Sequence, residues 1–218
     1  MVPGTDLNIE NNVHCGEATL AIIFPTSQAR GQSAKIRIRQ NTIQAITGLL
    51  VSAPFERPPR PNIPVLIESD ANLWDVYFLA SLATQRINDN PGLPRLTGTI
   101  MRGLFRWQGE KNQYRIRHSF FGISQPRQKT RRVPGPVKLS EWDAYWGQTN
   151  TGSRQLVVPV QDTGLFERDQ PSLVPRDFLT LLGNLKLSSG ESSIGAQTEI
   201  VGPGLEYTNW ILSQTQAN

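Results

Sequence analysis

The sequence predicts a β-rich α+β fold made of antiparallel sheets or a partly open barrel, with one main helix. Three observations lead to this prediction. Sixteen Pro and eighteen Gly interrupt the 218-residue chain too often for long helices. Several short segments alternate apolar with polar residues or are rich in β-branched residues, as strands are. Only one segment, about 70–89, carries apolar residues at sustained helical spacing.

The N-terminal β segment, residues 1–56, is predicted to contain three strands. Residues 17–25 form an apolar run, and residues 34–39 alternate Ile with Lys or Arg. Residues 43–53 are rich in β-branched side chains and contain Gly48, which favours a bent strand. The run PFERPPRP at 54–61 then favours an extended connector, and we place a domain boundary there.

The second predicted unit, residues 62–101, has the order strand, helix, strand. The strand IPVLIES leads into the helix, whose N-terminus Asp70 or Asn72 can cap. The apolar residues at helical spacing are Leu73, Val76, Tyr77, Ala80, Ala83 and Ile87. The NPG sequence at 90–92 is expected to end this helix.

The third region, residues 102–218, is predicted to be β-rich, and it can form one domain with 1–56. A β-hairpin is expected at its start, with strands TGTIMRGLFRW and QYRIRHSFFGI joined by the turn QGEKN. A basic, Pro-bounded loop follows at 124–136. We find no internal repeat in the chain.

Positive charge is concentrated in residues 102–138. This segment has ten Lys or Arg against one acid, a net charge of +9, whereas the rest of the chain sums to −5. A basic region on an otherwise acidic body is therefore expected. The candidate residues for binding nucleic acid or an acidic partner are Arg102, Arg106, Lys111, Arg115, Arg117, Arg127, Lys129, Arg131 and Arg132.

The residue types that catalysis requires do not cluster in this sequence. The single cysteine, Cys15, excludes an internal disulfide framework and a metal site built on several thiolates. The two histidines, His14 and His118, are far apart in the chain and have no partnering carboxylate close in sequence. We therefore predict that the protein is not an enzyme and has no catalytic residues, no cofactor and no metal site.

The ends of the chain and its hydropathy bear on localisation. Residues 1–12 lack the basic start and apolar run of a signal peptide, and no apolar stretch approaches the length that crosses a bilayer. We expect a cytoplasmic or virion protein that is not embedded in a membrane.

One segment, about 63–101, resembles a LysM module. The residues that carry the resemblance are VLIES running into DANLWDV, with Asp70, Leu73 and Trp74 in the expected order, then NPGL at 90–93 and LTGTIM. The segment departs from the family pattern at Ser69, where Gly is usual, and by one extra residue between Asp70 and Trp74. The resemblance implies either sugar binding on cell walls or a protein-binding role in contractile phage tails and their baseplates.

Three functions follow from these features. The leading expectation is a structural subunit of a large multi-protein assembly, specifically a phage tail or baseplate component in a homo- or hetero-oligomeric ring. One alternative is a nucleic-acid-binding protein that uses the basic, aromatic β-hairpin. The other is a carbohydrate-binding module. Aromatic anchors for a protein interface are expected at Trp74, Trp107, Trp142, Trp146 and Trp210.

Overall fold

The computed structural model describes residues 6–23, 34–52, 64–83, 92–125, 128–148 and 150–156. Most of these residues lie in strands. The strands are β1 (Asp6–Glu10), β2 (Val13–Ile23), β3 (Lys35–Arg39), β4 (Thr42–Ser52), β5 (Val65–Asp70), β6 (Leu73–Ala83), β7 (Phe105–Glu110), β8 (Gln113–Gln125), β9 (Gln128–Arg132) and β10 (Arg154–Gln155). The two described helices are α1 (Leu93–Leu104) and α2 (Leu139–Trp146).

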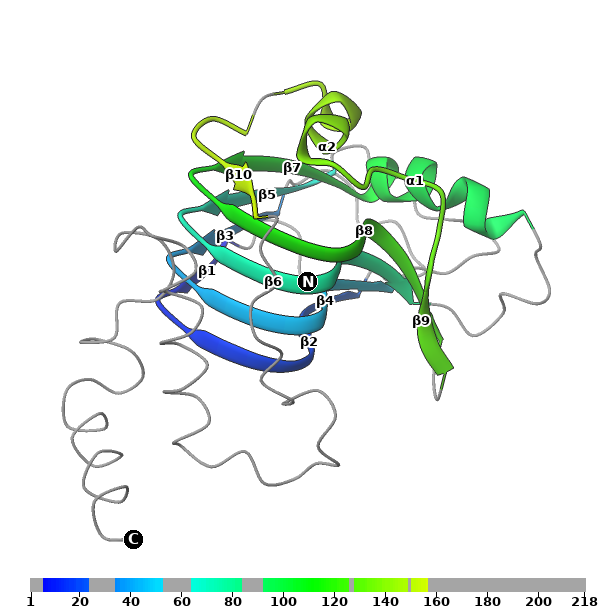
Figure 1. Ribbon diagram of the computed structural model, residues 1–218, viewed down its shortest axis with the longest axis horizontal. Helices are drawn as coiled ribbons and strands as arrows, with labels where there is room; N and C mark the ends of the chain where they lie inside the picture. Colours follow the sequence, from blue (N-terminus) through cyan, green and yellow to red (C-terminus); the bar gives the residue numbers. More distant parts are fainter. Residues whose placement is uncertain are drawn as a thin grey trace, which may run out of the picture.

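The strands form two parallel sheets between which the chain alternates. One sheet has the order β1-β3-β5-β7, and the other has the order β10-β8-β6-β4-β2. Each odd-numbered strand up to β7 is followed by an even-numbered strand of the second sheet, so every pair of strands makes one coil of a parallel β-helix. Figure 1 shows these coils stacked on one another, with the first coil at the bottom and α2 at the top.

The two strands of each coil are joined by a two-residue turn that repeats from coil to coil. The first turn residue has a positive φ in each case: Asn11, Gln40, Ala71 and Lys111, with φ between 50° and 56°. The second turn residue is always asparagine: Asn12, Asn41, Asn72 and Asn112. Left-handed backbone at Gln40 or Ala71 is costly for a residue with a Cβ, so this turn needs compensating interactions.

Stacked asparagines provide that compensation. The backbone N–H of Asn12 donates to Oδ1 of Asn41, that of Asn41 to Oδ1 of Asn72, and that of Asn72 to Oδ1 of Asn112, at 2.9–3.0 Å. The side-chain amides of Asn41 and Asn72 also donate to the carbonyl oxygens of Ile9 and Ile38 in the coil before. Buried polar groups at the turns are thereby satisfied, and the coils are locked in register.

The core lies between the two sheets and is built of columns of inward side chains. In the first sheet Leu7, Ile36, Ile67 and Trp107 are in register. In the second sheet His14, Ile43, Trp74 and Tyr114 are in register. Except in the first coil, the members of both columns are almost completely buried.

Helix α2 closes one end of the stack. The Trp142 ring stacks on Phe120 at a centroid distance of 4.8 Å and meets Trp107 edge-on at 5.8 Å. The Trp146 ring lies 5.1 Å from that of Phe105. Because both tryptophans are buried, α2 covers the aromatic core of the last complete coil.

The predicted sheet type is wrong. The pairings within both sheets are parallel, and only β8 with β9 is antiparallel. The fold is therefore neither a set of antiparallel sheets nor a partly open barrel. Short strands punctuated by Gly and Pro are common to both classes, so the composition did not distinguish an antiparallel sheet from a wound parallel one.

The predicted helix at 70–89 is also wrong, because Leu73–Ala83 is β6. The strand-helix-strand unit of 62–101 is corrected with it: the described residues there form β5, β6 and most of α1. A strand in the middle of a sheet buried on both faces is apolar at nearly every position, and such a run also satisfies helical spacing. Trp74 and Leu82 pack in the core, whereas Leu73 and Phe78 are buried outside it.

The predicted hairpin of 97–123 does not form. Residues 97–104 belong to α1, and β7 and β8 lie in different sheets, joined by the turn at Lys111 and Asn112. The strands expected at 17–25, 34–39 and 43–53 are confirmed as β2, β3 and β4, apart from their ends. β4 and β6, which lie on either side of the predicted connector at 54–61, are neighbours in one sheet.

Candidate protein interface

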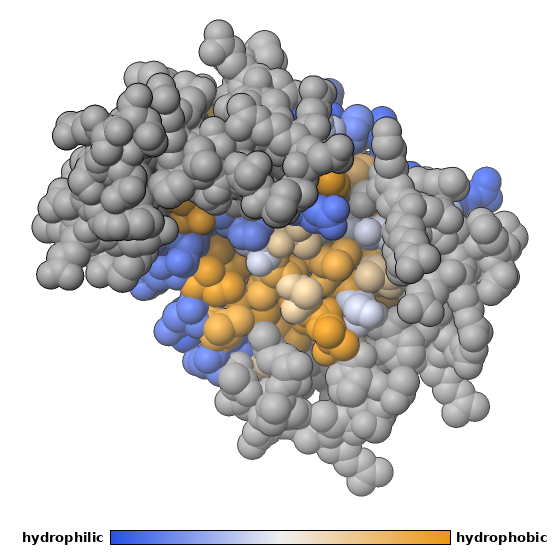
Figure 2. Space-filling model, turned by 90° about the horizontal axis from the view of Figure 1, so that it is seen from below, coloured by the Kyte–Doolittle hydropathy of each residue, from blue (hydrophilic) through white to orange (hydrophobic). Residues whose placement is uncertain are grey.

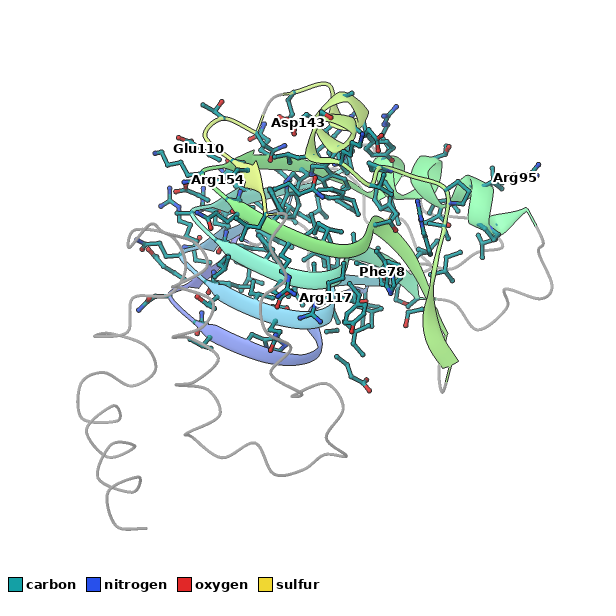
Figure 3. All side chains as sticks on the ribbon, viewed as in Figure 1. Phe78, Arg95, Glu110, Arg117, Asp143 and Arg154 are labelled. Carbon is teal, nitrogen blue, oxygen red and sulfur yellow. The ribbon has the colours of Figure 1, made fainter. Side chains whose placement is uncertain are left out.

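The predicted basic residues are spread over different parts of the structure. Arg102 is on α1 and its guanidinium lies 4.1 Å from the Tyr145 ring centroid, while Arg106 is exposed on β7. Lys111 is in a turn, 3.1 Å from Glu110. Figure 3 shows the labelled cations, with Arg117 and Arg154 on neighbouring strands of the six-stranded sheet and Arg95 on α1.

Arg115 and Arg117 lie together on β8, as predicted, but they contact a buried carboxylate. Arg117 donates to both oxygens of Asp75 at 3.0 Å, and Arg115 Nη1 lies 3.4 Å from Asp75 Oδ2. Gln44 donates to the same Oδ2 at 3.0 Å. Asp75 is fully buried, so this cluster stabilises the outer face of the second sheet through charge-assisted hydrogen bonds.

The remaining basic candidates belong to or adjoin β9. Lys129, Arg131 and Arg132 are on this strand, and only Arg132 has a described side chain, which is exposed. Arg127 lies outside the described residues. Arg132 lies across from Gly122 of β8, not across from Arg115 or Arg117.

Four of the five tryptophans expected to be interface anchors are in the hydrophobic core. Trp74, Trp107 and Trp142 are completely buried, and Trp146 is nearly so. Their rings contact one another in a row: the ring centroids of Trp74 and Trp107 are 5.9 Å apart, and those of Trp107 and Trp142 are 5.8 Å apart. Trp210 lies outside the described residues.

The first coil presents an apolar surface at the end of the stack opposite α2. Leu7 and Ile9 are only half-buried, whereas Ile36 and Ile38, their neighbours in the next coil, are completely covered. Ile23 at the end of β2 is 64% exposed. Figure 2, which views the molecule from this end, shows hydrophobic residues gathered across it. We call this surface, formed by β1 and β2, the open end.

Among the described strands, β1 and β2 are the terminal strands of their sheets, paired on one side only, with β3 and β4. Edge strands of this kind are templates for pairing with another chain, and natural proteins usually block them. Among the described residues, no helix lies over this end as α2 lies over the other.

The asparagine ladder also stops at the open end. Asn12 donates its backbone N–H and its side-chain amide to Asn41, and the side-chain amide also reaches the carbonyl oxygen of Glu10. In contrast with Oδ1 of the other three ladder asparagines, Oδ1 of Asn12 accepts no hydrogen bond from any described residue. At the other end the ladder is completed by Ser153, whose Oγ accepts the N–H of Asn112 at 2.9 Å.

Charges on the outer face of β1, β3 and β5 alternate in sign from strand to strand, whereas at the next strand, β7, Asp70 is in register with Glu110. β1 carries Asp6 and Glu10, β3 carries three cations, and β5 carries Glu68 and Asp70. The ion pairs run across the strands: Arg37 contacts Asp6 at 3.1 Å and Glu68 at 3.3 Å, and Lys35 contacts Glu68 at 2.5 Å. The outermost row of this ladder, on β1, is acidic.

His14 is a polar residue within the open end. It lies in register with the core residue Ile43, and its Nε2 is buried without a hydrogen-bond partner in the described structure. Burial lowers the pKa of His14 below its usual value of 6.5, against the smaller raising effect of a hydrogen bond with the Ala18 backbone. The neutral imidazole is the form that suits this surface.

Sequence reasoning missed the open end because it missed the coil repeat. The signal is a recurring pattern of two inward residues followed by an asparagine three positions later. It is present as Leu7-x-Ile9-x-x-Asn12, Ile36-x-Ile38-x-x-Asn41, Ile67-x-Ser69-x-x-Asn72 and Trp107-x-Gly109-x-x-Asn112. Aligning these four segments predicts stacked coils.

Metal-binding and membrane-spanning features are absent from the described part of the chain. No group of three or more His, Cys, Asp or Glu there is arranged to hold a metal ion. Neither described helix has the length and apolar character required to cross a membrane. Comparison of the chain with protein-family models, curated protein sequences and solved structures finds no match in any of the three.

Proposed function

We propose that this protein is a non-enzymatic structural subunit that joins a protein assembly through the open end of its β-helix. The observation that carries the proposal is the exposure of core positions in the first coil, where Leu7 and Ile9 continue columns that are fully buried in the next coil. Apolar surface of this kind, rimmed by polar residues, is typical of protein interaction sites.

Strand addition is the mode of association that the open end favours. A further strand beside β1 would pair the backbone groups that no described strand pairs and cover its inward aliphatic side chains in the same step. The main-chain hydrogen bonds would contribute affinity, and the inward side chains would set the register. The side chains of this surface also have a structural role, because they pack on the second coil.

The proposal is made at the level of an assembly subunit. The expectation of a phage tail or baseplate component drew on a LysM-like helix at 70–89, and these residues include strand β6. Nucleic-acid binding draws less support than assembly, because Arg115 and Arg117 contact buried Asp75 and the other described cations lie on separate elements.

Site-specific photo-crosslinking tests the proposal. A benzophenone amino acid is placed at Asn8, which is exposed on β1, and, in a control protein, at Gln108, which is exposed on β7 at the other edge of the same sheet. After irradiation in the cells that make the protein, we expect protein adducts from position 8 and none from position 108. Adducts from neither position, or equally from both, would contradict assembly through the open end.

An inward substitution provides a second control. Ile9→Asp places a carboxylate in the apolar surface of the open end, and we expect it to remove the adducts formed from position 8. Circular dichroism of the variant establishes that the coils above still fold. Adducts that persist in folded Ile9→Asp protein would show that the contact does not use this surface.

A further inference from the structure

The kind of partner that fits the open end can be inferred from two ladders, one of outward charges and one of asparagines. Among the described residues, both end at the first coil. This step rests on the proposed function and adds the kind of partner that fits. Three features of the open end specify a partner: the acidic outer row of β1, its aliphatic inner row and Oδ1 of Asn12, to which no described residue donates.

The outer row specifies charge. Between β1 and β3, both acids of β1 face a base: Asp6 is in register with Lys35, and Glu10 with Arg39. Arg39 is in turn in register with Asp70, at an N–O distance of 3.8 Å. A parallel strand added to β1 in the same register would therefore place its outward side chains opposite Asp6, Asn8 and Glu10. Cations at these positions continue the alternation, whereas acids there would repel.

The inner row and the turn specify the remaining pattern. Leu7 and Ile9 require aliphatic residues between the cations, because alternate residues of a strand point to the same face. Oδ1 of Asn12, to which no described residue donates, can accept a backbone N–H at the turn, which in the other coils is that of the preceding asparagine. A strand of alternating basic and aliphatic residues that leads into an asparagine turn meets all three requirements.

We propose that the open end binds, as a parallel added coil, a segment of another polypeptide with the pattern basic-aliphatic-basic-aliphatic-basic followed by an asparagine turn. Within this chain the pattern is that of Lys35–Arg39 and Asn41, which the second coil already uses. The partner is thus a basic, strand-forming segment of a different protein.

A second copy of this chain fits the open end less well. A two-fold axis at Asn8 would run β1 antiparallel to its copy and set Leu7 against Ile9 of the copy, but it would also set Asp6 against Glu10 of the copy. Like charges directly opposite each other destabilise a strand pair. Head-to-tail stacking of described surfaces is blocked by α2, which covers the other end.

A peptide that copies the second coil is a suitable probe. The peptide AKIRIRQNTIQAI, the sequence of residues 34–46, is labelled with fluorescein and titrated with the full chain. The matched control peptide, AEIEIEQNTIQAI, keeps the strand and turn pattern but inverts the outward charges. We expect the basic peptide to bind at least about tenfold more tightly, which corresponds to about 1.4 kcal/mol.

Charge reversal on the protein completes the test. Glu10 is exposed and has no ion-pair partner among the described residues, so Glu10→Lys breaks no ion pair there. The new Lys faces Arg39, and circular dichroism of the variant establishes that it folds. This variant is expected to weaken binding of the basic peptide and to strengthen binding of the acidic peptide. An inverted preference of this kind does not result from unfolding, which would lower the affinity for both peptides.

The outcomes separate this inference from the proposed function. Equal binding of the two peptides, no binding of either, or a preference unchanged by Glu10→Lys would overturn the basic-strand partner. If photo-adducts still form from position 8, assembly through the open end survives that failure. A concentration-dependent dimer that competes with the basic peptide would instead identify a second copy as the occupant and overturn the inference.

Discussion

At the scale of single residues, the asparagine ladder is the most regular feature of the molecule. Asn72 illustrates how much one side chain does: its Oδ1 accepts the N–H and the side-chain amide of Asn41, and its own amide reaches Ile38 O and Asn112 Oδ1. Asn72 is completely buried, so water cannot replace these partners. The terminal Asn12 is exposed and makes fewer contacts.

This contrast yields a prediction. Asn72→Ala leaves the N–H of Asn41 and the carbonyl of Ile38 without these partners, and we expect it to lower the free energy of unfolding by about 3 kcal/mol. Asn12→Ala removes an exposed side chain and is expected to cost less than about 1 kcal/mol. Urea denaturation of both variants measures the difference. Equal losses would show that the ladder does not stabilise the coils through its buried members.

His14 gives a pH-dependent prediction. Its pKa is lowered in the folded protein, so as pH falls the unfolded chain takes up a proton before the folded chain does. Stability is therefore expected to fall as pH drops from 7.5 to 5.5, through the unfolded pKa of 6.5 and toward the lower folded value. The variant His14→Leu should lose less stability over this range. Urea denaturation at the two pH values measures the loss of stability for each protein. If the unchanged protein and His14→Leu lost the same stability, the burial of neutral His14 would be contradicted.

Residue patterns could have predicted part of the candidate interface. The spacing from inward aliphatic residues to asparagine is visible in the sequence at Leu7, Ile36 and Ile67. However, successive ladder asparagines are separated by 29, 31 and 40 residues. A search for a repeat of fixed length therefore does not detect the pattern. The exposure of Leu7 and Ile9 could not be predicted, because it depends on which coils stack on which.

At the scale of elements, strand character was easier to predict than strand partners. The alternation of Ile with Lys or Arg identified β3 correctly, since only one of its faces is apolar. The same rule failed for β6, which packs in the core on one face and is buried on the other. Parallel pairing joins residues about 30 positions apart, and the local sequence does not indicate which strands will pair.

Close packing between elements provides a prediction at two glycines. A Cβ at Gly48 would lie 2.8 Å from the carbonyl oxygen of Leu79 and 2.9 Å from the Trp74 ring, so β4 and β6 could not keep their spacing. We expect Gly48→Ala to lower the free energy of unfolding by about 1–3 kcal/mol. A Cβ at Gly103, in α1, would contact nothing within 4 Å.

Gly103→Ala is the matched control for this prediction. It adds the same methyl group in open space within a helix, so we expect no loss of stability or a gain of up to about 1 kcal/mol. Thermal or urea denaturation of the two variants gives both values. A Gly48→Ala protein as stable as Gly103→Ala would mean that β4 and β6 are not in contact at this position.

At the scale of the whole molecule, the described fold is a stack with two unlike ends. A solenoid is stabilised mainly by contacts between neighbouring coils, so a coil with one neighbour is less stable than a coil with two. The α2 end compensates with aromatic packing of Trp142 and Trp146 and with the Ser153 contact. The first coil lacks an equivalent cover among the described residues, which is why its polar ladders and apolar columns both end unfinished.

Hydrogen exchange should reveal this asymmetry along the stack. β4 and β6 each pair with strands on both sides, so we expect their amides to exchange slowest, at rates set by global unfolding. Among the described strands, β1 and β2 pair on one side only, and their amides are expected to exchange much faster, through local opening of the first coil. Residue-resolved exchange by NMR gives the profile. Because Ile9→Asp weakens the contact of the first coil with the second, it should speed exchange in β1 and β2 and leave β6 nearly unchanged. Equal acceleration in all three strands would show instead that the coils unfold as one cooperative unit.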